Sequence, residues 1–112
     1  MTKQKRTVFY LSDRTGITAE TLGHSLLTQF DGIEWEIINV PFLDDLEKVQ
    51  AVLVQINHAT EYDGHRPLVF STLLKPEILE VIKRTNCRVF DFFETFINPI
   101  EQELNHPFAS MA

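Results

Sequence analysis

The stretch VFYLSDRTGITAETLGHSLLTQF, residues 8–30, decides the fold of this chain. Its apolar start, rich in β-forming residues, predicts a strand over Thr7–Leu11. A polar loop follows, and a helix is then expected from about Gly16 to Phe30, where Asp31-Gly32 provides a stop signal. A strand, a loop and a helix in this order make one βα unit.

Three further βα units follow in the same order. Strands are predicted over about Glu34–Val40, Leu68–Ser71 and Arg88–Phe92. Helices are expected over Asp44–Asp63, with Asp44 as the amino-terminal cap and Glu47 completing a capping box, and over about Pro76–Arg84. A last helical segment contains Phe96, Ile97, Ile100 and Leu104, with Asp91 and Glu94 at its start; Pro99 is expected to break it, or to restart it with Asn98 as the new cap.

Apolar residues at helical spacing predict which helix faces are buried. In the first helix the expected stripe consists of Ala19, Leu22, Leu26, Leu27 and Phe30. In the second helix it consists of Leu46, Val49, Leu53 and Ile56. The aromatic cluster near the carboxyl end is also expected in the core; it consists of Phe90, Phe92, Phe93 and Phe96.

The strand sequences also predict the order of the strands. The first and third strands are continuous apolar runs, which is typical of central parallel strands covered on both faces. The second and fourth strands mix polar with apolar residues, which suits the two edges. We therefore expect an α/β fold with a three-layer open parallel sheet, four βα units and the strand order 2-1-3-4. Residues 1–104 are expected to form this domain, and residues 105–112 a tail or the start of a linker.

The composition excludes several classes of function. A chain of 112 residues, 44% of them apolar, fits one domain. The formal charge of -6 disfavours nucleic-acid binding. The single cysteine, Cys87, cannot form an internal disulfide, and no histidine pair has metal-ligand spacing, so no metal site is expected. No apolar run approaches the roughly 20 residues of a membrane span, so we expect a soluble cytoplasmic protein without a membrane partner.

The expected strand order also predicts where a ligand would bind. In an open α/β sheet, ligands bind beyond the carboxyl ends of the strands, where the winding direction reverses. Here this point lies between the first and third strands, and two loops follow those strands. The candidate phosphate-binding residues are Ser12, Asp13, Arg14, Thr15, Gly16 and Thr18 in the first loop, and Ser71, Thr72 and Lys75 in the second.

The first loop has the composition of an anion site at a helix start. Backbone N–H groups and the positive helix end attract phosphate oxygens, Gly16 permits close approach, and Arg14 adds a charge-assisted contact. Asp13 is a candidate to orient a hydroxyl or to act as a base. A structural alternative stays open, because caps and turns use the same residue types. In that alternative Thr15 or Thr18 merely caps the helix, and Lys75 is an ordinary exposed lysine.

Two common phosphate-binding motifs are absent from the sequence. The first strand is not followed by G-x-G-x-x-G, and G-x-x-x-x-G-K-[ST] occurs nowhere in the chain. This chain therefore lacks the usual means of holding a dinucleotide or a nucleoside triphosphate.

The segments that carry the candidate site also carry a resemblance. VFYLSDRTGITAETLGHSLLTQF, VPFLDDLEKV, RPLVFSTLLKPEI and INPIEQEL resemble the amino-terminal region of the phosphoenolpyruvate synthase regulatory protein family, close kin to the pyruvate, phosphate dikinase regulatory proteins. The resemblance covers nearly all of the chain. It implies a bifunctional enzyme that phosphorylates a threonine of its target with ADP as donor. The same enzyme removes that phosphate with inorganic phosphate and releases pyrophosphate.

The resemblance has further implications for cofactors and partners. Family members are more than twice as long and carry a P-loop after the region matched here, so this chain is expected to need the rest of such a protein for activity. No cofactor is expected in this chain; ADP, inorganic phosphate and pyrophosphate are implied for the longer protein. The implied protein substrate is phosphoenolpyruvate synthase or pyruvate, phosphate dikinase, with the motifs closer to the first branch. Whether the intact protein is a homodimer stays open.

Other classes of function are alternatives. The spacing of Thr15, Gly16 and Thr18 is similar to the phosphate loop of flavodoxins, so a domain that binds FMN or phosphate is one alternative. A fifth strand and a Trp or Tyr pair to hold the flavin ring are missing. A response-regulator receiver lacks support because the third strand ends in Ser71-Thr72 instead of an aspartate. A non-catalytic docking or dimerisation module is the last alternative.

Overall fold

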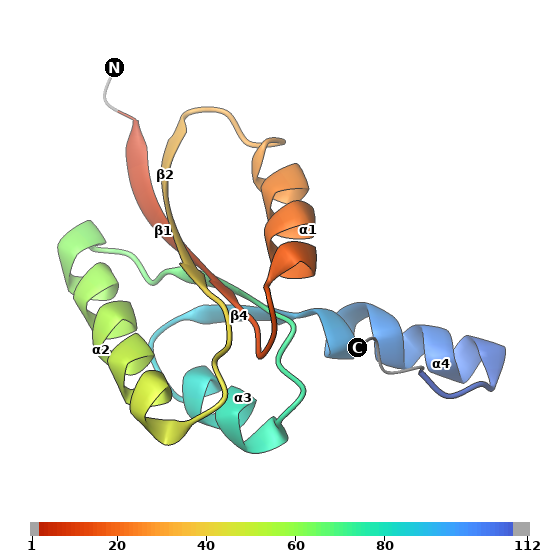
Figure 1. The fold of residues 1–112 in the computed structure, drawn as a ribbon. Coiled ribbons are helices and arrows are strands. Elements are labelled where there is room, and N and C mark those ends of the chain that lie inside the picture. Colours follow the sequence, from red (N-terminus) through yellow and green to blue (C-terminus); the bar gives the residue numbers. More distant parts are fainter. Residues whose placement is uncertain (1–2, 109–112) are drawn as a thin grey trace.

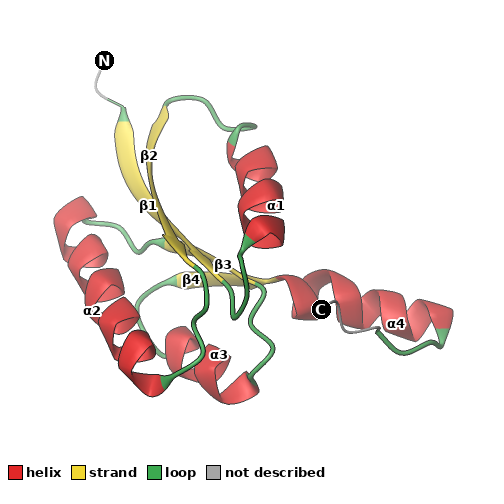
Figure 2. Ribbon diagram, in the orientation of Figure 1, coloured by secondary structure: helices red, strands yellow, loops and turns green. Residues whose placement is uncertain are grey.

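A computed structural model describes residues 3–108 of the chain, and within them parallel strands alternate with helices (Figures 1 and 2). The strands are β1 (Gln4–Leu11), β2 (Ile33–Val40), β3 (Leu68–Ser71) and β4 (Arg88–Asp91). The helices are α1 (Ile17–Leu27), α2 (Leu46–Asp63), α3 (Pro76–Lys83) and α4 (Asn98–Leu104), and a π-helical segment, η1 (Phe93–Ile97), precedes α4. The expected α/β fold is confirmed.

The sheet has the expected strand order, β2-β1-β3-β4, with every pair parallel. Val8 of β1 lies between Ile37 of β2 and Leu68 of β3, so β1 is central. β1 starts at Gln4 instead of the expected Thr7, because its polar first residues pair with β2 beyond the point where β3 begins. Edge pairing of this kind requires no apolar residues, and the apolar pattern therefore underestimated the strand.

Two apolar clusters lie on opposite faces of the sheet, because alternate strand residues point to opposite sides. Phe9, Leu11 and Val69 pack with α2 and α3 on one face. Val8, Tyr10 and Phe70 pack with α1 on the other face. Figure 2 shows α2 and α3 together on one side of the sheet and α1 on the opposite side, which gives the expected three layers.

The buried face of α1 differs from the expected stripe. Of the five predicted residues only Ala19 and Leu27 are buried, and Gly23 lies between them; Leu22, Leu26 and Phe30 are exposed. A Cβ atom added at Gly23 would overlap the Tyr10 ring, so α1 approaches β1 through its smallest residues. The close approach rotates the larger side chains away from the sheet. The helix also ends at Leu27, before the expected Phe30.

The start of α2 is shifted by one residue from the expectation. Asp45 is the amino-terminal cap, and its Oδ1 accepts the backbone N–H of Lys48 at 2.8 Å. The prediction that Asp44 caps this helix was wrong, and with it the capping box to Glu47. Leu46, expected in the buried stripe, is exposed because it precedes the turn that reaches the sheet. The buried stripe consists of Val49, Val52, Ile56 and Ala59.

The last helical segment is continuous through Pro99, contrary to the expected break. Asn98 has helical dihedral angles, and its N–H donates to the Phe93 carbonyl five residues earlier. Proline lacks an N–H and its ring crowds the preceding turn, and a widened π turn absorbs both effects. The expected cap at Asp91 is confirmed, since its Oδ2 accepts the Glu94 N–H at 3.0 Å.

The end of the described chain turns back along α4. Asn105 adopts a left-handed conformation with φ 50°, and the Phe108 N–H donates to Glu101 Oε2 at 2.6 Å. The ring of Phe108 contacts the ring of Phe93 with centroids 5.3 Å apart. The expected tail covers residues 105–112, of which 109–112 lie outside the described residues.

Candidate functional site

A hollow of about 380 Å³ lies at the carboxyl ends of β1 and β3, where the winding direction reverses. One wall is formed by the β1–α1 loop and the residue after β3. Its residues are Ser12, Asp13, Arg14, Thr15, Gly16, Thr18 and Thr72. The other wall is apolar. Its residues are Ile17, Leu22, Leu74, Phe92, Phe93, Phe96, Ile97 and Phe108.

The β1–α1 loop ends at Gly16, which is the amino-terminal cap of α1. Gly16 has φ 83°, and α1 has no side-chain cap, so neither Thr15 nor Thr18 plays the capping role considered as the alternative. A Cβ at Gly16 would meet only ordinary contacts, so the left-handed backbone, and not space, favours glycine. The first-turn N–H groups have no partners within the helix and face the loop end. This arrangement suits an anion.

Backbone hydrogen bonds hold this loop against the β2–α2 loop. The Phe42 N–H donates to the Arg14 carbonyl, and the Leu43 N–H donates to the Ser12 carbonyl, both at 2.8 Å. The Ser12 side chain is buried, and its Oγ accepts the Arg14 N–H at 3.0 Å. The Arg14 side chain is exposed and, within residues 3–108, its guanidinium makes no hydrogen bond or ion pair. The backbone of Arg14 is therefore fixed while its charge stays accessible.

Asp13 joins the two loops that follow the central strands. Its Oδ2 accepts the backbone N–H of Leu74 at 3.3 Å. The Asp13 carboxylate therefore holds the two loops together at the edge of the hollow. This contact fits a structural role in the turn better than the role of a base.

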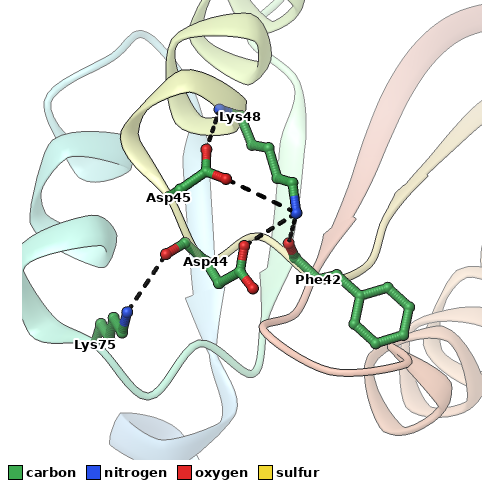
Figure 3. Close-up of polar contacts among 5 residues, drawn as sticks. All are labelled: Phe42, Asp44, Asp45, Lys48 and Lys75. Carbon is green, nitrogen blue, oxygen red and sulfur yellow. Dashed lines mark hydrogen bonds and ion pairs between the residues drawn. The ribbon is translucent and has the colours of Figure 1, made fainter.

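Two of the candidates do not reach the hollow. Ser71 is fully buried, and its Oγ accepts the Leu73 N–H at 3.1 Å. Lys75 points to the start of α2, where its Nζ donates to the Asp44 carbonyl at 3.4 Å (Figure 3). The structure thus brings together seven of the nine candidate residues and leaves Ser71 and Lys75 outside the hollow.

A charged cluster supports the β2–α2 loop beside the hollow. Lys48 Nζ donates to the Phe42 carbonyl and to Asp44 Oδ1, each at 3.0 Å, and lies 3.9 Å from Asp45 Oδ2 (Figure 3). The hydrogen bond from Lys48 holds the pKa of the Asp44 carboxyl below its ordinary value. Phe42 has φ 55°, a conformation that bulky residues rarely adopt. Lys48 and the Arg14 carbonyl therefore hold Phe42 in a strained turn.

The apolar wall was missed because its residues were assigned to the core. Phe92 is buried as expected, but Phe90 and Phe93 are only partly buried and Phe96 is 46% exposed. The signal was present in the repeat of Phe96, Ile100 and Leu104, whose spacing shows one helix face. Spacing alone does not say what covers that face.

Asp91 is a buried carboxyl close to the hollow but not in its lining. Burial raises its pKa above the ordinary value, against the lowering effect of the hydrogen bond from the Glu94 N–H. Its Oδ1 is buried without a hydrogen-bond partner among the described residues. It caps η1, and so it positions one wall of the hollow.

A second hollow of about 620 Å³ lies at the opposite end of the molecule, between α2 and the first residues of β1 and β2. It contains none of the candidate residues and is lined by charges of both signs, among them Arg6, Glu34 and Asp63. Asp63 Oδ2 accepts the Thr7 hydroxyl at 2.7 Å. We therefore place the candidate site at the smaller hollow, where the loops of the central strands converge.

Within residues 3–108, no group of three potential metal-ligating side chains comes together. In the same part of the chain, no helix combines the length and the apolar character needed to cross a bilayer.

Residues 8–111 match the model of a protein family described as kinase/pyrophosphorylase. The chain is also similar to proteins named as phosphoenolpyruvate synthase regulatory proteins. The one from Nitrosomonas europaea is 59% identical over 103 residues, which cover 92% of this chain and 38% of the relative. The one from Marinobacter nauticus is 54% identical over 101 residues, or 90% of this chain and 37% of the relative. The one from Alkalilimnicola ehrlichii is 52% identical over 107 residues, or 96% and 39%. The chain spans about two fifths of the length of these curated relatives.

Proposed function

Since this chain belongs to the kinase/pyrophosphorylase family, we propose that it is one part of an enzyme that regulates phosphoenolpyruvate synthase by reversible phosphorylation. In the forward reaction the terminal phosphoryl group of ADP passes to a threonine hydroxyl of the synthase and leaves AMP. In the reverse reaction inorganic phosphate takes up that group and forms pyrophosphate. The match over residues 8–111 is the observation that carries this proposal.

Within this enzyme, the β1–α1 loop binds an anionic oxygen of a phosphate-bearing substrate. Three features support this role. Gly16 opens the first turn of α1 without a side-chain cap, Arg14 offers an accessible guanidinium, and both line the hollow. Ser12 and Asp13 serve the loop by fixing its backbone. Thr15, Thr18 and Thr72 add hydroxyl groups on the same wall.

The chain is inactive by itself in this proposal, because its sequence contains no P-loop. The test compares the 112-residue chain with the Nitrosomonas europaea relative in an ADP-dependent phosphorylation assay on phosphoenolpyruvate synthase. We expect transfer only with the longer protein. Phosphoryl transfer by the 112-residue chain alone would contradict the proposal that this chain is inactive by itself.

Replacing Arg14 tests the anion site. We expect Arg14→Ala to weaken phosphate and pyrophosphate binding by about tenfold or more, because a charge-assisted hydrogen bond contributes roughly 1.5–3 kcal/mol. Binding is measured from amide chemical shifts during titration, and the shifts should concentrate in residues 12–18. Arg84→Ala, at the far end of α3, is the matched control and should bind as the unchanged chain does. An unchanged affinity in Arg14→Ala, or no shift in the loop, refutes the site.

The flavin-carrier alternative receives no support from the family match. Among the described residues that line the hollow, the aromatic ones are all phenylalanines, and none is a Trp or Tyr that could hold a flavin ring. The docking alternative has a physical basis in the apolar wall, which leads to the next inference.

A further inference from the structure

Two helices present apolar stripes that nothing among the described residues covers. On α1, Leu22 lines the hollow, and Leu26 and Phe30 continue from it at four-residue spacing. Phe30, just past the end of the helix, is 61% exposed. Residues four apart lie on one helix face, so Leu22 and Leu26 form one strip, and Phe30 follows it in the turn after the helix. The neighbouring face of α1, through Ala19 and Gly23, is the one that packs on the sheet.

The second stripe runs along η1 and α4. Phe96 lines the hollow, and Ile100 and Leu104 follow at the same spacing, with about half or more of each side chain exposed. Figure 1 shows α4 leaving the sheet and extending away from the body of the molecule. Three large apolar side chains on an extended helix are typical of an element that packs against further polypeptide.

The sheet face between these stripes is also incompletely covered. α1 is the helix that packs on this face, and Leu68 and Phe90 on it are only partly buried. The covering over Phe90 is an arginine, with the Arg88 guanidinium 4.5 Å from the ring centroid. The opposite face carries both α2 and α3. Parallel strands are ordinarily covered by helices on both faces, and here α1 leaves part of its face without a covering helix.

The path of the chain indicates what covers the rest of this face. After α4 the chain reverses at Asn105 and returns to the hollow, where Phe108 packs on Phe93. The described residues thus end at the rim of the uncovered face. More than half of each similar relative has no counterpart in this chain, which covers 38% of the Nitrosomonas europaea protein.

We infer that the apolar face formed by the α1 stripe, the α4 stripe and the hollow is the seat of the polypeptide that the longer relatives have and this chain lacks. The part of that polypeptide that contacts this face is a helix with apolar residues on one side. Glu101 and Glu103 lie on the same helix as the α4 stripe, so basic residues flank the part of the occupant that packs on α4. The β1–α1 loop then lies between the two parts of the enzyme, where a substrate can be enclosed.

Single cysteines report whether this face is covered. Cys87 is the only cysteine of the chain and it is buried, so an engineered thiol dominates maleimide labelling. The variant is Leu26→Cys, made in the 112-residue chain and in the same chain extended by the unmatched part of the Nitrosomonas europaea relative, with any cysteines of that part replaced by serine. The matched control is Val54→Cys, exposed on α2 at the opposite face.

We expect Leu26→Cys to react at least about tenfold more slowly in the extended protein, while Val54→Cys reacts equally in both. Leu104→Cys on α4 repeats the measurement with a side chain that a folding defect at α1 would not affect. Hydroxyl-radical footprinting of the intact, unsubstituted relative gives a further readout at the positions that match Leu26 and Phe30. Equal labelling of Leu26→Cys in both proteins overturns the inference. Slow labelling already in the 112-residue chain, together with a dimer in sedimentation, also overturns it and makes a second copy the occupant.

Discussion

Asp91 shows how one buried side chain links stability to the shape of the candidate site. Its carboxylate caps η1 through the Glu94 N–H, and η1 supplies Phe93, Phe96 and Ile97 to the hollow. The cost of this role is a charge placed among apolar groups, with Oδ1 left without a partner among the described residues. Burial consequently raises the pKa of Asp91.

The raised pKa predicts a pH dependence that Asp91→Asn removes. Above about pH 4 the carboxyl is ionised in the unfolded chain, while the native state still holds the proton. The native state therefore binds more protons in this window, and the contribution of Asp91 to stability falls as pH rises through it. Asparagine cannot ionise and still accepts the Glu94 N–H. We expect the free energy of unfolding of Asp91→Asn, relative to the unchanged chain, to increase from about pH 4 to neutral pH.

Urea unfolding at a series of pH values measures this difference. Because other carboxyls titrate identically in both proteins, subtraction isolates Asp91. Asp31→Asn, at the exposed turn before β2, is the matched control for the loss of one carboxyl at the surface. A difference that is constant, or that decreases with pH, contradicts a raised pKa at Asp91.

At the scale of elements, helix ends decide where the loops of the site begin. α2 starts at Asp45 because this side chain, and not that of Asp44, reaches the Lys48 N–H. The free Asp44 side chain then pairs with the Lys48 ammonium, and its carbonyl accepts Lys75. With the cap at Asp45 instead of Asp44, Lys48 donates to the Phe42 carbonyl and Lys75 to the Asp44 carbonyl. Both lysines therefore bind the backbone of the β2–α2 loop and not solvent or a ligand.

The two aspartates therefore predict different mutational effects. Asp45→Ala should destabilise the chain by about 1 kcal/mol, the ordinary cost of a lost amino-terminal cap. Asp44→Ala should have a much smaller effect, because exposed ion pairs contribute little. Thermal or urea unfolding of both variants makes the comparison. If Asp44→Ala is the more destabilising change, the cap is misassigned.

At the scale of the whole molecule, the shape of the candidate site depends on three loops that are distant in sequence. The loop after β1 is bonded to the loop after β2 through Phe42 and Leu43, and to the loop after β3 through Asp13. Lys48 stabilises this arrangement by holding the Phe42 carbonyl. It is a positioning residue in this scheme, since it does not line the hollow.

Lys48→Met tests whether the loops act as one unit. We expect phosphate binding to weaken severalfold, because release of Phe42 loosens its hydrogen bond to the Arg14 carbonyl. Lys83→Met is the matched control, since it also removes one positive charge from an exposed ion pair, the one with Glu94. The Arg14 and Phe42 amide shifts of the free protein should change only in Lys48→Met. If both variants weaken phosphate binding equally, Lys48 acts only through its positive charge and does not position the loops.

The sequence alone was sufficient for the fold class, the strand order and the family. Each of these depends on local patterns: continuous apolar runs in β1 and β3, mixed runs in β2 and β4, and the order of residues in the β1–α1 loop. The strand order in turn located the edge of the sheet where seven candidate residues line one hollow. These inferences succeeded because the periods of strands and helices are set by backbone geometry and can be read along the chain.

Other features depended on contacts between distant segments. The buried face of α1 follows from the fit of Gly23 against Tyr10, and the orientation of Lys75 follows from the position of the Asp44 carbonyl. The apolar wall follows from a helix that continues through Pro99 and leaves the sheet. Local sequence shows that a side chain is apolar or charged, but its burial and its partner depend on which surface the tertiary structure brings against it. For that reason the sequence by itself determined which edge of the sheet carries the candidate residues, and the tertiary structure decided which of them line the hollow and what forms its other wall.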